Sequence, residues 1–87
     1  MTSNYNRRIK PMKTVQISLN SIDKVKSFVN DITRFNNDFD LVSGRYVIDA
    51  KSIMGIFSLD LSKPIDLSIH AEDNLDEILE ALKPYMI

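Results

Sequence analysis

Apolar and polar residues alternate one by one in two stretches of the chain, residues 15–20 and 65–70. A period of two residues is typical of a β-strand with one buried face. A further alternation runs through residues 39–41, residues 46–48 are rich in strand formers, and Ser43 and Gly44 lie between them as a turn. We therefore expect one strand in each of the first two stretches and a β-hairpin in the third.

Two other stretches repeat their apolar residues at three- and four-residue steps, which is the spacing of one helix face. The first stripe consists of Ile22, Val25, Phe28, Val29, Ile32 and Phe35, and the second of Leu75, Ile78, Leu79 and Leu82. Asn20 or Ser21 can cap the first helix, and Asn74 with Glu77 three residues later forms a capping pattern for the second. Both stripes predict helices that lay one face on a core.

A shorter apolar run, residues 53–61, follows Ser52, is interrupted by Gly55, and fits one or two helical turns. The predicted order is therefore strand, helix, strand, strand, short helix, strand, helix. Four strands with one apolar face, and enough helices to cover that face, give a two-layer α+β sandwich. The order of the strands within the sheet does not follow from the periodicity.

The composition narrows the function classes. The 87 residues suffice for one domain, and a net charge of −1 gives no sign of a nucleic-acid or anionic-membrane partner. The chain has no cysteine and one histidine, which excludes a disulfide framework, a thiolate nucleophile and the usual metal motifs. We expect no metal and no cofactor. No apolar stretch approaches the ~18 residues that a membrane span needs.

The first eleven residues are polar, carry Arg7, Arg8 and Lys10, and lack the apolar centre of a signal peptide. We expect residues 1–11 to form a flexible N-terminal extension and residues 12–87 to form the single domain of a cytoplasmic protein.

One run of residues has a counterpart in a known family. Residues 51–59 read K-S-I-M-G-I-F-S-L, and they resemble the K-S-I-M-G-V-M-S-L run of HPr, a protein of the phosphoenolpyruvate-dependent sugar phosphotransferase system. The order of elements around the run is also similar to that of HPr. The resemblance implies the HPr-like open-faced β-sandwich, with βαββαβα order and a four-stranded antiparallel sheet that has its helices on one face.

The phosphorylatable histidine of HPr lies in a G-I-H-A-R-P segment before the first helix, and this segment has no match here. Alignment through the first helix puts Ser21 near the place of the histidine and Asp23 near that of the arginine, with Lys24 following. A carrier needs a nucleophile that forms a transferable phosphoramidate, whereas a serine ester is too stable to pass its phosphate on. The anionic Asp23 would also repel phosphate. We therefore expect a degenerate active-site loop, and we expect His70 to be an ordinary solvent-facing strand residue.

Ser52 matches the serine of HPr that an ATP-dependent kinase phosphorylates in low-GC Gram-positive bacteria. A phosphate at the start of a helix gains from the helix dipole and the free N–H groups, and Lys51 would add a cation. The alternative is that Ser52 is only a helix N-cap.

The resemblance also implies a partner-docking surface, made of Lys51, Ile53, Met54 and Phe57, with Ile56 and Leu59 facing the sheet. Exposed apolar side chains that include an adaptable methionine suit such a surface. The alternative is that all the apolar residues of the run belong to the core.

Three hypotheses follow. The first is a regulatory, non-enzymatic HPr-like protein, similar to the catabolite-repression homologues of HPr, whose partners would be HPr kinase/phosphorylase and a transcriptional repressor or phosphotransferase-system components. The second is a protein-interaction domain that keeps only the HPr fold. The third is a phosphocarrier that uses an unexpected residue.

Overall fold

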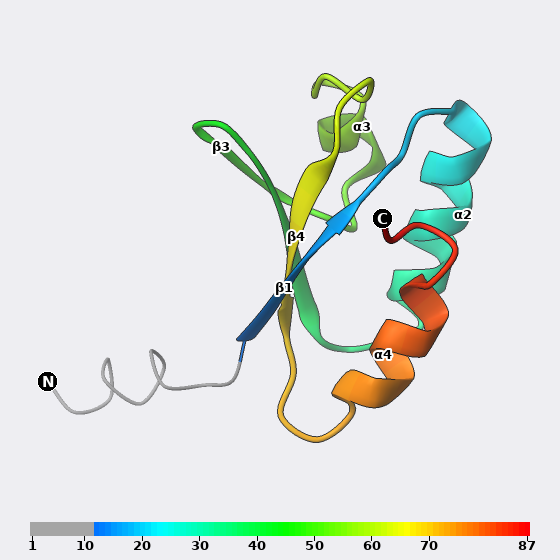
Figure 1. The fold of residues 1–87 in the computed structure, drawn as a ribbon, viewed down its shortest axis with the longest axis vertical. Helices are drawn as coiled ribbons and strands as arrows, with labels where there is room; N and C mark the ends of the chain where they lie inside the picture. Colours follow the sequence, from blue (N-terminus) through cyan, green and yellow to red (C-terminus); the bar gives the residue numbers. More distant parts are fainter. Residues whose placement is uncertain (1–11) are drawn as a thin grey trace, which may run out of the picture.

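Helices and strands follow one another in the predicted order (Figure 1). The computed structural model describes residues 12–87, so the predicted extension of residues 1–11 lies outside the described residues. The elements are β1 (Met12–Ile17), α2 (Ile22–Thr33), β2 (Asp38–Ser43), β3 (Tyr46–Asp49), α3 (Ile53–Ile56), β4 (Ile65–His70) and α4 (Leu75–Leu82). The predicted βαββαβα sandwich is confirmed.

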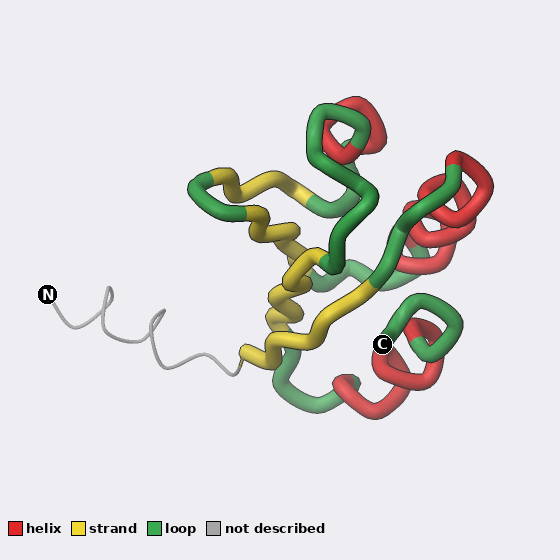
Figure 2. Tube along the Cα trace, turned by 45° about the horizontal axis from the view of Figure 1, so that its top comes forward, coloured by secondary structure: helices red, strands yellow, loops and turns green. Residues whose placement is uncertain are grey.

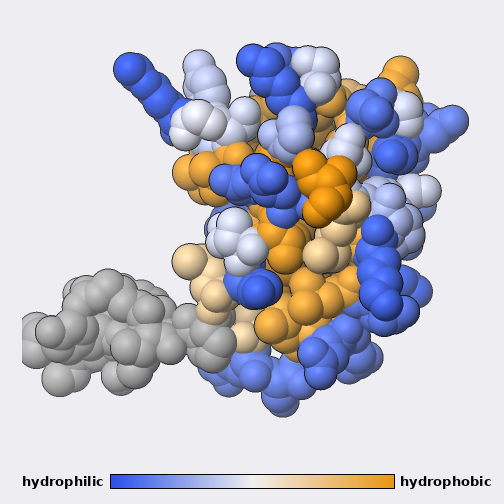
Figure 3. Space-filling model, viewed as in Figure 1, coloured by the Kyte–Doolittle hydropathy of each residue, from blue (hydrophilic) through white to orange (hydrophobic). Residues whose placement is uncertain are grey.

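The four strands form one antiparallel sheet in the order β1-β4-β2-β3. The helices lie on one side of this sheet, and the other side is left open (Figures 1 and 2). The interior strand β4 shows the difference between the two faces of the sheet. Ile65, Leu67 and Ile69 are buried on the helix side, while the alternate residues are half-buried on the open face. Apolar residues accordingly gather between the sheet and the helices (Figure 3).

The β2–β3 hairpin closes through a two-residue turn at Gly44 and Arg45. Gly44 has a φ of 60°, a left-handed conformation that glycine adopts without steric cost. No other described residue has a positive φ, and a positive φ at the first turn position alone matches a type II′ hairpin turn. The predicted turn at Ser43 and Gly44 is thus displaced by one residue.

Three local predictions were wrong. Leu19 is buried as expected, but β1 has already ended at Ile17. Ile22 belongs by spacing to the apolar stripe of α2, yet this first residue of the helix is 61% exposed. Asn74 precedes α4 but makes no side-chain capping bond; its amide is instead paired with Asn37.

Candidate functional site

Ser52 lies at the N-cap of the short helix α3. Its backbone is extended, and its Oγ accepts a hydrogen bond of 3.3 Å from the backbone N–H of Gly55. Its carbonyl oxygen accepts the first helical bond, 3.0 Å from the N–H of Ile56. The hydroxyl group remains on the surface because Ser52 is exposed. The predicted cap is confirmed, and the cap does not remove the hydroxyl from solvent.

Gly55 explains how α3 can lie close to the sheet. A Cβ placed on Gly55 would be 2.7 Å from Cγ2 of Ile48 in β3, closer than any normal van der Waals contact. A larger residue would therefore push α3 away from β3, and Ser52 and Met54 with it. The sequence pattern shows Gly55 only as an interruption of the apolar run and does not reveal this close approach to Ile48.

The predicted docking surface is smaller than expected. Met54 is 78% exposed and Phe57 is 41% exposed, so both can meet a partner. Ile53 does not belong with them, because it is half-buried and packs against the core. Ile56 is fully buried and Leu59 packs on the core, as predicted.

Lys51 makes contacts that the sequence does not predict. Its Nζ donates a 2.7 Å hydrogen bond to the carbonyl oxygen of Phe35 and lies 5.6 Å from the ring centroid of Phe39. Phe35 follows α2, a helix with no basic residue in its last turn. Lys51 thus adds a cation at the negative end of the α2 dipole, next to the C-cap residue Arg34, whose Nε donates to the carbonyl oxygen of Asp31 at 3.4 Å. It does not place that cation at the Ser52 hydroxyl.

The degenerate loop of the sequence analysis forms the start of α2. Ser21 is the N-cap, and its Oγ accepts from the backbone N–H of Lys24 at 3.1 Å. Asp23 is exposed in the first turn, where a negative charge stabilises the helix. Figure 1 shows this turn at the same end of the molecule as α3. Ser21, Asp23 and Lys24 therefore act as ordinary helix-start residues.

His70 is the last residue of β4, and α3 precedes the first residue of that strand. At the usual rise per residue, β4 spans about 17 Å. The Nε2 atom of His70 is 3.2 Å from Oδ2 of Asp40 on the open face of the sheet, as expected of a strand residue that points away from the core. Its carbonyl oxygen accepts from Nδ2 of Asn37 at 2.9 Å. An open polar hollow of about 380 Å³ borders His70 and Asn74.

Residues 12–87 contain no group of three or more histidine, cysteine or acidic side chains that could hold a metal ion. Within the same residues, no helix is both long and apolar enough to cross a membrane.

Comparison with known proteins identifies the fold. No family model and no curated protein matches the sequence. Among solved structures, the phosphocarrier protein HPr from Bacillus anthracis strain Ames is similar, with 31% identity and a TM-score of 0.65; the match covers 88% of this chain and 96% of that one. HPr-C-His from Thermoanaerobacter tengcongensis has 26% identity and a TM-score of 0.66, over 85% and 88% of the two chains.

Proposed function

The chain belongs to the HPr phosphocarrier family, and from this premise we propose that it is a regulatory member, modified at Ser52, and not a carrier. One observation supports this proposal most. The hydroxyl of Ser52 is exposed at the start of α3, and the exposed side chains of Met54 and Phe57 follow it in the chain. A kinase can reach the hydroxyl group of Ser52, and a partner can bind the phosphorylated serine together with Met54 and Phe57.

Phosphorylation would change the chemistry of this surface. A phosphate adds a charge of about −1.5 to −2 and three strong acceptor oxygens. The unmodified surface offers apolar contact through Met54 and Phe57. The modified surface would in addition favour partners with arginine or lysine side chains. The proposed partners are an HPr kinase/phosphorylase and a repressor or phosphotransferase-system component, and the protein acts by binding in the cytoplasm without catalysing a reaction.

The start of α2 gives the reason for proposing a loss of carrier activity. Ser21 occupies the N-cap with its Oγ bonded to a backbone N–H. A serine ester does not transfer its phosphate as a histidine phosphoramidate does, and Asp23 adds repulsion. His70 contacts the carboxylate of Asp40 and is followed in the chain by Glu72 and Asp73, an acidic setting that disfavours an incoming phosphate.

The test offers the purified protein ATP with an HPr kinase, and separately phosphoenolpyruvate with enzyme I, and maps any phosphate by mass spectrometry. We expect phosphate on Ser52 in the first reaction, loss of that signal in Ser52→Ala, and no loss in Ser58→Ala. Ser58 is a matched control because it is also exposed and lies shortly after α3, whereas Ser52 lies directly before it. The Oγ of Ser58 donates to the carbonyl oxygen of Gly55. Acid-labile phosphate on His70 would contradict the proposal.

A second candidate function is a protein-interaction domain without phosphorylation. The position of Lys51 favours it, because its ammonium is bonded to Phe35 and gives no help to a phosphate on Ser52. The absence of modification in both reactions would select this function.

A further inference from the structure

The strand β3 leaves an unusual surface at one edge of the sheet. Tyr46 and Val47 are 68% and 66% exposed, and β3 is the last strand in the sheet order. Figures 1 and 2 show the turn end of the β2–β3 hairpin extending away from α2 and α4. Exposed apolar edge strands favour pairing with another chain, and proteins usually protect them with a very short strand, charged residues, proline or a covering segment. Strand β3 is short and ends in Asp49, but its centre is apolar. None of the four residues of β3 is a lysine or proline.

The opposite edge, β1, does have such protection. Met86 forms a bridge with Ile17, and the N–H of Ile87 donates to the carbonyl oxygen of Gln16 at 3.2 Å. The remaining part of β1 carries Lys13, which is exposed. The two edges therefore differ, and β3 is the one suited to pairing.

The register of the hairpin shows which backbone groups of β3 are free. Ser43 and Tyr46 flank the two-residue turn and pair with each other. In an antiparallel ladder, hydrogen-bonded and non-hydrogen-bonded pairs alternate, and the pair that closes a two-residue turn is hydrogen-bonded. Val47, opposite Val42, therefore points its N–H and C=O away from β2. Asp49 lies two residues after Val47, so its backbone groups also point away from β2. Its carbonyl oxygen accepts from the N–H of Ser52 on this outer side of the strand.

We propose that two copies of this chain associate through β3, antiparallel and centred on Val47. Each Val47 then exchanges two backbone hydrogen bonds with the Val47 of the second copy, which satisfies the free groups of the edge. Tyr46 of one copy lies opposite Ile48 of the other, and the two Val47 side chains lie next to each other, so the exposed apolar residues of the edge gain cross-strand contacts. The two sheets join into one continuous sheet related by a twofold axis.

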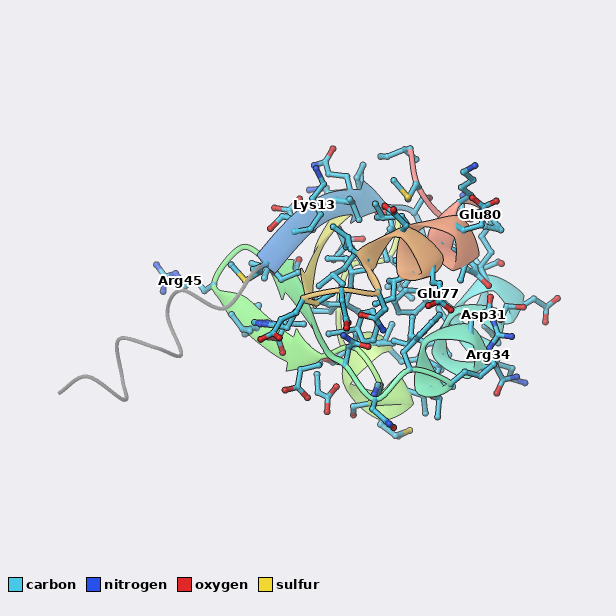
Figure 4. All side chains as sticks on the ribbon, turned by 90° about the horizontal axis from the view of Figure 1, so that it is seen from below. Lys13, Asp31, Arg34, Arg45, Glu77 and Glu80 are labelled. Carbon is cyan, nitrogen blue, oxygen red and sulfur yellow. The ribbon has the colours of Figure 1, made fainter. Side chains whose placement is uncertain are left out.

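Charge complementarity fixes this register. Centring on Val47 places Arg45 of each copy opposite Asp49 of the other, so twofold symmetry creates two opposite-charge pairs. Arg45 projects from the hairpin (Figure 4), and within residues 12–87 it forms no ion pair. Asp49 uses one carboxylate oxygen for the N–H of Lys51 at 2.9 Å, and its second oxygen can accept from Arg45. Centring on Ile48 would fail, because the backbone groups of Ile48 face β2.

Sedimentation of the full chain over a wide concentration range tests the proposal. We expect a concentration-dependent dimer and an association constant about tenfold or more lower in Arg45→Glu and in Val47→Lys, which both put like charges across the axis. Lys13→Glu, a charge reversal on the other edge, is the matched control and should leave association unchanged. Arg45→Asp combined with Asp49→Arg restores opposite charges and should recover the dimer. A monomer at every concentration, or a dimer that only Lys13→Glu weakens, would overturn the proposal.

A covalent trap gives an independent readout, because the chain contains no cysteine. The Cβ atoms of a hydrogen-bonded antiparallel pair are about 5.5 Å apart, beyond the ~3.5–4.5 Å of an unstrained disulfide, so a short bis-maleimide is the suitable trap. Val47→Cys should therefore form a cross-linked dimer with this reagent, faster than Thr14→Cys on the β1 edge. Equal rates for the two variants would contradict pairing at Val47.

Discussion

The ammonium group of Lys51 is bonded to the carbonyl oxygen of Phe35, 2.7 Å away, and lies over the ring of Phe39. This contact joins the segment before α3 to the end of α2, two elements that are separated in the chain by the β2–β3 hairpin. It also means that the first residue of the K-S-I-M-G run stabilises the fold. The docking role of Lys51 remains a prediction, which this contact does not test.

Lys51→Met tests the stabilising contact. The variant keeps an apolar stem but leaves the Phe35 carbonyl without its donor, removes one of two cations at the end of α2 (Arg34 remains) and removes the cation over the Phe39 ring. We expect a loss of about 1–2 kcal/mol in the free energy of unfolding, which corresponds to a fall of roughly 4–16 °C in Tm for a domain of this size. Thermal and urea unfolding measure it.

Lys63→Met is the matched control. Lys63 is exposed, and its Nζ reaches only Asp60, at 4.0 Å, so we expect a change within about 0.5 kcal/mol. Equal effects of the two substitutions would show that Lys51 has no special role.

Gly55 predicts a steric effect. Gly55→Ala would bring a methyl group to 2.7 Å from Cγ2 of Ile48, and we expect overpacking to cost about 1–3 kcal/mol of unfolding free energy. Ile48→Ala removes the opposing methyl group, so the double variant should be less destabilised than the sum of the two single variants. Additive losses in a urea-unfolding double-mutant cycle would exclude the contact as the cause.

The side chains of Asn37 and Asn74 exchange hydrogen bonds of 2.8 and 3.1 Å, and Asn37 also donates to the carbonyl oxygen of His70. They tie the segment before β2 to the segment before α4. Asn37→Ala should cost about 1–2 kcal/mol, because these half-buried groups lose their partner. Amide hydrogen exchange should accelerate in both segments together. The exposed neighbour in Asn36→Ala should change neither, and acceleration confined to one segment would argue against a tie.

The parts of the fold that could be predicted from the sequence are those that depend on near neighbours. The caps at Ser21 and Ser52 involve residues three positions away, and the element order follows from periodicity. The contacts of Asn74 and Lys51 could not be predicted because their partners lie 37 and 16 residues away in the chain. No local pattern records such contacts.

The extent of burial was also hard to predict. Ile53 and Met54 are adjacent and both apolar, but α3 turns one toward the core and the other into solvent. Four helical residues are too few for a stripe to show which is which. The sheet order, which places β3 at an edge, likewise depends on contacts between distant segments.

Tyr85 links the end of the chain to α2. Its hydroxyl group donates a 2.7 Å hydrogen bond to Oδ2 of Asp31, and its ring packs edge-on against Phe28 with centroids 5.5 Å apart. Burial disfavours the phenolate, and the bond to Asp31 disfavours it further, so the pKa of Tyr85 is raised from 10.0 to about 12. Tyr85→Phe should cost about 1 kcal/mol at neutral pH, since it removes one hydrogen bond from a buried residue.

The raised pKa of Tyr85 predicts how this cost changes with pH. The folded protein keeps the proton longer than the unfolded chain, so the stabilisation is complete below the unfolded pKa of 10.0 and is lost as pH rises toward 12. We therefore expect the stability difference of about 1 kcal/mol between the natural chain and Tyr85→Phe to fall above pH 10 and to reverse its sign as pH approaches 12. Urea unfolding at a series of alkaline pH values measures the difference. Tyr46→Phe, at an exposed tyrosine, is the control for general alkaline effects, and a difference for Tyr85→Phe that stays constant through this range would show that the hydroxyl group does not titrate as the structure requires.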